Sequence, residues 1–356
     1  NLIIAELDAG NDVTVVLDKS FLLTTADTGN VMAAFSARGP AAVSAILKPD
    51  VTAPGINILA GFTADAANAA SGENYAYLSG TSMSTPHVAG AAALLLQAHP
   101  TWTPSAIKSA LMTSARQDVK ASAGLGDASP FDFGAGHIVP NKALDPGLVF
   151  DVSDDEYVAF ACGVESPAVS SARCDELAAA GFSFAAADLN QPSISTSTLA
   201  VQQTIQRRAT NVSDEAESFT VATSPPPGMN IAVTPSSLTL SPGDSAMFDV
   251  TLSYLSGPLD LWRFGSLTWT GESRDVYMPI AVKPTSISAP GEVTSFGGTG
   301  TQAFEVEFGY DGGYSPGVHG LNLPLLSDAD GNGDGFSFVD NDPGKTFSFR
   351  SDNGVT

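Results

Sequence analysis

The segment Gly80-Thr-Ser-Met-Ser-Thr-Pro-His-Val-Ala-Gly90 decides how this sequence is interpreted, because a strand-like run turns there into an apolar helix. We expect the helix to begin near Ser82 and to end just before Pro100, since proline cannot continue a helix. Gly80 would permit a tight turn between strand and helix, and Gly90 would permit close packing of the helix against a neighbour. The segment therefore predicts a strand, a turn and a packed helix.

Two explanations of Ser82 are open at this point. Ser and Thr are the ordinary N-caps of helices, so Ser82 or Thr81 could do no more than cap this one. A serine at the start of a helix could instead act as a nucleophile, because its hydroxyl lies at an exposed turn. The N–H groups of the first helical turn would then point to where an oxyanion develops. On the tripeptide Gly-Thr-Ser alone, capping is the commoner role.

The composition limits what the chain can bind. Its 356 residues are too many for one ordinary domain, and 43% hydrophobic content is enough for real cores. The formal net charge of −23 argues against nucleic acid and anionic membranes, because both are held by Lys and Arg. The apolar run Val88–Leu96 is far too short to span a bilayer. We therefore expect a secreted, extracellular protein with neither nucleic acid nor a membrane as partner.

The pattern of turns and apolar runs changes along the chain. Residues 1–34 are strand-like, and a second helix is predicted from Thr103, an N-cap that Pro104 follows. From residue 191 to residue 284 short strands alternate with turns, which is typical of a β-sandwich. The predicted strands of this sandwich include Ile231–Val233, Ser237–Leu240, Ala246–Leu252, Gly265–Thr270 and Val276–Val282.

A family resemblance emerges from the longer motifs. The segment around Ser82 resembles the active-site serine segment of the subtilisin-like serine proteases, or subtilases. Other stretches are similar to the plant cucumisin-type branch of that family, which carries a protease-associated insert and a fibronectin-III-like domain. These stretches are Phe35–Pro40, Leu47–Leu59, Thr103–Met112, Phe131–Phe150, Asp188–Ser193 and Thr210–Val212. The resemblance covers about residues 30–284.

The resemblance implies a fold. It implies an α/β region, the C-terminal half of a subtilisin-like catalytic domain with a parallel sheet, followed by an all-β sandwich and a β-rich tail. The expected boundaries are 1–34 for the end of the protease-associated insert, 35–188 for the catalytic half, 189–284 for the fibronectin-III-like sandwich and 285–356 for an acidic Gly- and Asp-rich β module or tail.

The resemblance also implies a reaction. Ser82 would attack a peptide bond and form an acyl-enzyme, with no cofactor required for catalysis. The backbone N–H of Ser82 would form part of the oxyanion hole, assisted by Thr81, in a loop that includes Gly80. The substrates would be proteins or peptides. The alternative is a non-catalytic β-rich interaction protein that carries a degenerate protease remnant.

The remaining members of the triad are expected outside this sequence. The family places its catalytic Asp and His, and its oxyanion Asn, before the serine segment, so they would precede Asn1 in an N-terminal half that acts as partner. A substitute base within the chain is disfavoured, because His87 lies roughly 140° around and about 7.5 Å along the helix from Ser82. Of the other histidines, we expect His99 and His137 to be structural. The chain alone is therefore expected to be inactive.

Two weaker signals concern metal and disulfide chemistry. Oxygen side chains alternate in the tail as in the first half of a calcium loop, which could hold a structural calcium, but Asp and Gly also make plain surface turns. Both explanations stay open. Cys162 and Cys174 could be free thiols or could close a small loop, and secretion favours the disulfide. The candidate calcium ligands are Asp328, Asp330, Asn332 and Asp334.

Three further residues have a preferred interpretation. Trp262 and Trp269 are expected to belong to the sandwich core rather than to a ligand platform. Asn211 opens an Asn-Val-Ser glycosylation sequon, which has meaning only in a eukaryotic secretory pathway.

Overall fold

The computed structural model describes Ala9 and residues 29–42, 45–63, 74–122, 127–289 and 306–309, and all structural statements refer to these residues. The chain divides into two units, residues 1–309 and residues 310–356, and the second lies outside the described part. The proposed calcium loop and most of residues 1–34 also lie outside it. Among the described helices, none combines the length and the apolar character that crossing a bilayer requires.

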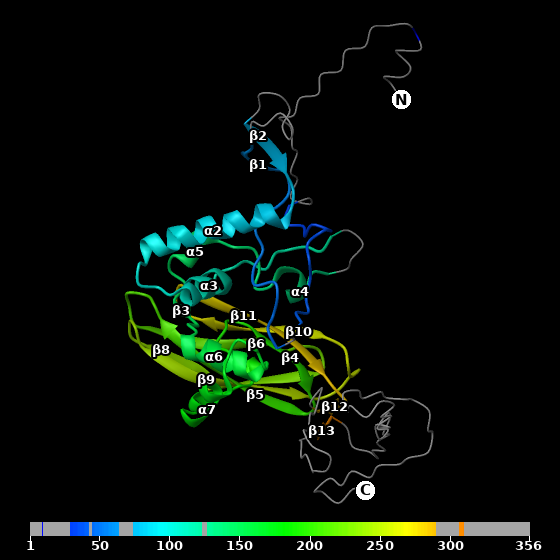
Figure 1. The fold of residues 1–356 in the computed structure, drawn as a ribbon, viewed down its shortest axis with the longest axis vertical. Helices are drawn as coiled ribbons and strands as arrows, with labels where there is room; N and C mark the ends of the chain where they lie inside the picture. The colour runs from blue at the N-terminus through cyan, green and yellow to red at the C-terminus, as the bar shows by residue number, and fades with distance from the viewer. Residues whose placement is uncertain are drawn as a thin grey trace, which may run out of the picture. The chain divides into compact units, whose positions relative to one another are not determined.

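A β-sandwich forms the C-terminal part of the described chain, as the sequence predicted (Figure 1). One sheet has the strand order β4-β11-β10-β6-β8, and the other has the order β3-β5-β9-β7. All pairings are antiparallel except the parallel pair of β4 and β11. The strands are β3 (Leu148–Val149), β4 (Ile194–Leu199), β5 (Gln202–Asn211), β6 (Glu217–Ser224), β7 (Met229–Thr234), β8 (Ser237–Leu240), β9 (Ser245–Tyr254), β10 (Arg263–Thr270) and β11 (Asp275–Pro284).

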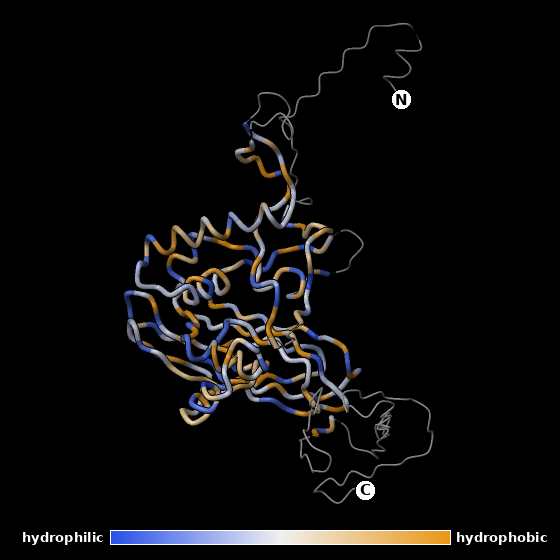
Figure 2. Tube along the Cα trace, in the orientation of Figure 1, coloured by the Kyte–Doolittle hydropathy of each residue, from blue (hydrophilic) through white to orange (hydrophobic). Residues whose placement is uncertain are grey.

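Alternating side chains build the core between the two sheets. Along β9, Phe248, Val250 and Leu252 are buried at every second position, because successive side chains of a strand point to opposite faces. Trp269 on β10 is fully buried, and its ring packs edge-on against Phe248 at 5.0 Å. The core assignment of Trp269 is therefore confirmed. Apolar residues recur along these strands in Figure 2.

Helices and short strands precede the sandwich. The helix α3 begins where the sequence predicted, because the Thr103 hydroxyl accepts a hydrogen bond from Ala106 N at 2.9 Å and Pro104 occupies the first position. Helices α6 and α7 were not predicted. The bounds are β1 (Ile58–Gly61), β2 (Tyr75–Leu78), α2 (Thr81–Ala98), α3 (Pro104–Thr113), α4 (Pro130–Phe133), α5 (Pro140–Ala143), α6 (Asp154–Gly163), α7 (Ser171–Ala179) and the 3-10 helix η1 (Ala186–Asp188); β12 (Ile287–Ser288) and β13 (Glu307–Phe308) follow the sandwich.

The helical region and the sandwich share their core. β3 pairs with β5, and its residue Leu148 packs among the buried residues of the sandwich. Phe131 of α4 makes edge contacts with Trp262 at 4.9 Å and with Phe264 at 5.0 Å. Trp262 is half-buried, and it lies at this junction rather than in the centre of the sandwich, where the sequence had placed it. No separate linker divides the two regions at this point.

The parallel sheet expected for residues 35–188 does not appear among the described residues. β1 and β2 form an antiparallel hairpin, and the parallel contacts of this region are two isolated bridges. Those bridges join Val31 with Lys120 and Thr52 with His137. A parallel sheet needs several extended strands side by side, and the bridged segments have no such neighbouring strands in the described part of the chain.

Candidate active site

Ser82 is the second residue of α2, and its side chain is exposed. The N-cap position is taken by Gly80, and no side chain caps the helix. No described residue forms a hydrogen bond with the Ser82 hydroxyl. The capping explanation of Ser82 and Thr81 is therefore wrong, and the hydroxyl is available to an incoming group.

The first turn of α2 contains backbone amides without helical partners, because the helix begins at Thr81. The first N–H groups of a helix have no carbonyl partner in a preceding turn. Met83 N donates a hydrogen bond to Gly80 O at 3.0 Å. The amides of Thr81 and Ser82 remain as the first-turn donors that can bind another group. No acidic residue lies in this turn. An anion that forms on a group attacked by Ser82 would therefore meet donors and the positive end of the helix.

Two expectations about glycines need correction. The backbone of Gly80 is extended, with φ 165° and ψ 161°, a conformation that any residue adopts, so this turn does not require glycine. A Cβ added to Gly90 would meet nothing within 4 Å, so no described element packs closely there. The close neighbour that Gly90 was expected to accommodate is absent from the described residues.

A short segment, Ala53–Asn57, holds the start of α2 in place. Gly80 N donates to Gly55 O at 2.8 Å, and Ser84 Oγ donates to Ala53 O at 3.0 Å. Sequence reasoning missed this support. The available signal was the Ala-Pro-Gly sequence at residues 53–55, which is typical of a turn.

His87 does not serve as the base of Ser82 in this structure. Its ring Nδ1 donates to Met83 O at 2.8 Å, four residues back on the same helix. The ring is thus turned to its own helix backbone, as the helical spacing from Ser82 predicted. His319 lies outside the described residues.

The two remaining histidines have structural partners. His99 ends α2, where its Nε2 donates to Leu144 O at 2.8 Å and its ring stacks on Trp102 at 3.9 Å. His137 Nδ1 donates to Ile138 O at 3.0 Å. The described residues therefore provide no histidine with the geometry of a general base for Ser82.

Asp50 anchors the region behind the candidate site. Its carboxylate lies 2.6 Å from Lys48 Nζ and 3.1 Å from Lys108 Nζ of α3. Burial lowers the pKa of Lys108, and the negative charge of Asp50 works against that shift. This ion-pair network joins α3 to the chain that leads into residues 53–55.

Cys162 of α6 and Cys174 of α7 form a disulfide, so the prediction of a bridge is confirmed. Both helices begin with a serine cap, Ser153 and Ser170, and that signal could have revealed them. The disulfide ties the two helices beside the sandwich.

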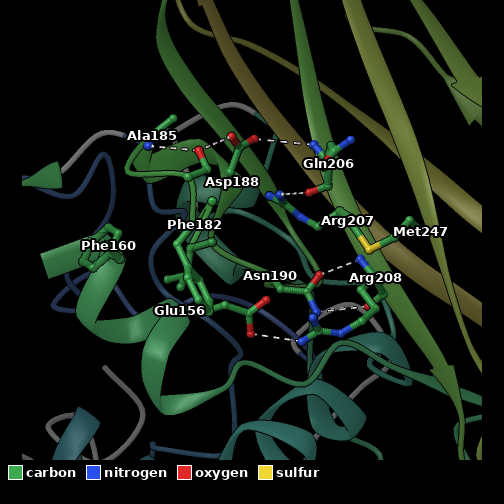
Figure 3. A pocket seen from close by; sticks show the side chains of 13 residues that line it. Glu156, Phe160, Phe182, Ala185, Asp188, Asn190, Gln206, Arg207, Arg208 and Met247 are labelled. Atoms are coloured by element: carbon green, nitrogen blue, oxygen red, sulfur yellow. Dashed lines mark hydrogen bonds and ion pairs between the residues drawn. The ribbon is translucent and has the colours of Figure 1, made fainter. Parts of the chain in front are cut away.

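A pocket of about 190 Å³ opens between α6, the η1 loop and β5 (Figure 3). Its charged groups already have partners. Glu156 pairs with Arg208 at 3.0 Å, and the buried Arg207 donates to the carbonyls of Gln191, Gln206 and Ser193. Burial lowers the pKa of Arg207 to about 10. Ser82 does not line this pocket, whose polar groups hold helix and sandwich together.

No cluster of three or more His, Cys, Asp or Glu side chains suited to a metal ion occurs in the described part of the chain. The candidate calcium ligands of the tail lie outside the described residues, so the calcium site stays a prediction.

Comparison with known proteins connects the Ser82 turn to a family. Residues 9–136 match the subtilase family, and residues 188–282 match a fibronectin type-III domain. The chain belongs to the subtilase family. The subtilisin-like protease SBT3.10 of Arabidopsis thaliana is 40% identical over 263 residues, which are 71% of this chain and 34% of that protein.

Further relatives give the same picture of this subtilase. Subtilisin-like protease SBT2.6 of Arabidopsis thaliana is 37% identical, over 70% of this chain and 33% of that protein. Subtilisin-like protease Glyma18g48580 of Glycine max is 38% identical, over 76% of this chain and 36% of that protein. The chain thus spans about a third of the length of the curated relatives that it matches.

Proposed function

We propose that this chain is the serine-bearing C-terminal part of a secreted subtilisin-like serine endopeptidase. Ser82 Oγ attacks the carbonyl carbon of a peptide bond, and its proton passes to a histidine supplied from outside this sequence. The tetrahedral oxyanion is held by the first-turn amide of Ser82, assisted by Thr81. The amine leaves, and water then hydrolyses the acyl group on Ser82. The substrates are proteins or peptides.

One observation carries this proposal: the Ser82 hydroxyl is exposed in the first turn of α2 and caps no backbone amide of that helix. A serine whose only task was capping would accept a hydrogen bond from the helix backbone. Among the described residues, His87, His99 and His137 each bond a backbone carbonyl, and none of them is placed to act as the base of Ser82. We therefore assign the catalytic Asp, the His and the oxyanion Asn to an N-terminal half of the catalytic domain.

The surface of α2 supports such a missing half. The helix contains no Asp, Glu, Lys or Arg, yet only Ala91 and Leu95 are buried, while Leu94 is 61% exposed. A helix that is apolar on all sides is normally buried on all sides. Figure 2 shows orange segments recurring along its length. We propose that the N-terminal half packs on this surface, over the open space at Gly90.

The hairpin β1–β2 points to the same partner. Leu59 is 56% exposed, Tyr75 66% and Tyr77 52%, so both strands present apolar side chains to solvent. An isolated two-stranded hairpin is at best marginally stable in water. Further strands from the N-terminal half would complete a sheet here, which would account for the parallel sheet that the family resemblance implies.

Secretion is also part of the proposal. The Cys162–Cys174 disulfide supports it, because such bonds persist in oxidising compartments.

Labelling with a fluorophosphonate tests the proposal. The complete protein should become modified at Ser82, and the variant Ser82→Ala should not. This chain alone should stay unmodified and should become modified once the N-terminal half is added. A folded complete protein that is never modified would overturn the proposal and would favour a non-catalytic interaction protein.

A second measurement tests the packing on α2. In the complete protein, Leu94→Glu should lower the melting temperature by several degrees and reduce labelling, because it places a charge in a covered apolar surface. In the isolated chain it should leave the melting temperature nearly unchanged. A different result would assign the surface to a second copy of this chain. In that case the isolated chain would self-associate, Leu94→Glu would abolish the self-association, and the same substitution would leave the complete protein's melting temperature and labelling unchanged.

A further inference from the structure

We infer that Ser84 is a positioning residue for the Ser82 nucleophile. Together with Gly55 it locks the first turn of α2 onto residues 53–55, and so fixes the direction of the Ser82 hydroxyl. The inference rests on the proposed function, and it concerns a residue that contacts neither substrate nor base.

Two hydrogen bonds across the turn carry the inference. Gly80 N, two residues before Ser82, donates to Gly55 O at 2.8 Å. Ser84 Oγ, two residues after it, donates to Ala53 O at 3.0 Å. The nucleophile thus lies between two points that are attached to the same neighbouring segment. A single attachment would leave the turn free to pivot, whereas two attachments fix it.

The contact is too close for any residue but glycine at position 55. A Cβ on Gly55 would lie 2.3 Å from Ser84 Oγ and 2.9 Å from Gly80 O. Both distances are below normal van der Waals contact, and one of the obstructing atoms belongs to the backbone. Because glycine has no side chain, the two segments can approach closely enough for both hydrogen bonds to form.

The segment that provides the carbonyls is itself fixed. Thr52 N donates to Gly136 O at 2.8 Å, and Ile138 N donates to Thr52 O at 3.0 Å. Asp50, just before it, accepts Ala135 N at its carbonyl and pairs with Lys108 of α3. The acceptors of the two hydrogen bonds are therefore held by the fold rather than placed on a free loop.

Positioning matters because nucleophilic attack depends on near-attack geometry. A displacement of about 1 Å can cost on the order of a hundredfold in rate. Helix ends open most readily, so the first turn of α2 needs an attachment of this kind. The Ser84 hydroxyl provides one without reaching the reacting atoms.

The chain contains a matched control in the next residue. Thr85 Oγ1 donates to Thr81 O at 3.0 Å, within the helix itself. Both residues therefore make a hydroxyl-to-carbonyl bond in the same turn, but only that of Ser84 leaves the helix. A merely local effect on helix stability should appear in both alanine variants.

The test compares Ser84→Ala, Gly55→Ala and Thr85→Ala in the complete protease. Ser84→Ala should lower kcat and the fluorophosphonate labelling rate about tenfold with KM within about twofold, since only orientation changes. Gly55→Ala should act in the same direction. Thr85→Ala should change the labelling rate by less than about twofold. Equal losses in Ser84→Ala and Thr85→Ala would overturn the inference.

Amide hydrogen exchange in this chain alone gives a readout that needs no catalysis. Exchange at Gly80 N–H should become several times faster in Ser84→Ala and stay unchanged in Thr85→Ala. Unchanged exchange in Ser84→Ala would overturn the inference while the proposed function stands. A complete wild-type protein that is never labelled would overturn the proposed function, and the positioning role with it.

Discussion

Arg274 and Asp145 form an ion pair at 2.5 Å between two parts of the fold that are far apart in sequence. Arg274 lies on the turn between β10 and β11, and Asp145 follows α5 in the helical region. The same guanidinium holds Glu217 of β6 at 2.7 Å, where the Glu217 side chain is only 6% exposed. The hydrogen bond to Asp145 is the main cause that raises the pKa of Arg274.

Replacing Arg274 by alanine should destabilise the chain by about 2 kcal/mol, because it leaves the buried Glu217 carboxylate without its cation. The matched control is Arg173→Ala. Arg173 also bridges two carboxylates, those of Asp155 and Glu176, but its side chain is 41% exposed. Its loss should lower stability clearly less than the loss of Arg274, because solvent screens an exposed ion pair. Urea unfolding of both variants measures the difference, and equal effects would contradict this account.

The disulfide should stabilise the helical hairpin of α6 and α7. It joins cysteines that are 12 residues apart, and closing a loop of that length is worth about 3 kcal/mol. The double variant Cys162→Ser, Cys174→Ser should lose about 2–3 kcal/mol of stability. Thermal unfolding with and without reductant measures this. Reductant should leave the double variant unaffected, and an equal effect of reductant on both proteins would contradict the prediction.

The sequon at Asn211 should carry no glycan. The Asn211 side chain is fully buried, and its Nδ2 donates to Glu215 O and Leu240 O at 2.9 Å each. Protein made in a eukaryotic secretory pathway should show no glycan mass at this site, because no room or free amide remains for one.

The substitution Asn211→Asp tests the same environment. It places a carboxylate against two carbonyl oxygens and should cost about 3 kcal/mol. The exposed Asn230 of β7 provides the control, since Asn230→Asp should change stability by less than about 0.5 kcal/mol. Folded protein with an unchanged unfolding midpoint for Asn211→Asp would argue against the buried position.

Acid should weaken the contact between α6 and β5. Burial by itself would raise the pKa of Glu156, but the hydrogen bonds from Ser153 and Arg208 outweigh it and hold that pKa below its ordinary value of 4.5. A depressed folded pKa means that the carboxylate stabilises the fold above pH 4.5 and loses this effect as the pH falls through the folded value.

Glu156→Gln should therefore be less stable than the wild type by about 1–2 kcal/mol at pH 7. The two stability curves should converge as the pH falls through the folded pKa of Glu156, which lies below 4.5, because the wild-type carboxyl becomes protonated there. Urea midpoints measured from pH 7 to pH 2.5 give the comparison. A constant difference over that range would show that the charge of Glu156 does not matter. Arg208→Gln should reduce the same pH dependence, because it removes one of the partners.

Much of the secondary structure was predictable, because its signals are local. Thr103 and Pro104 define the start of α3 by themselves, through a side-chain cap and a fixed φ. Alternating apolar residues predicted β9 and β10 to within a few residues. The strands β4, β5 and β6 escaped prediction, since their many Ser, Thr and Gln residues hide the alternation.

The sequence by itself determined the family, the chemistry of Ser82 as a hypothesis, and the existence of helix and sandwich, because motifs and periodicity depend only on residues near one another. Tertiary structure alone decided which distant groups meet. Nothing in the local sequence relates Arg274 to Asp145, buries Asn211, or brings Ala53 to the hydroxyl of Ser84. Those contacts form only when segments far apart in the sequence pack against one another, and no periodicity in the sequence encodes which segments will meet.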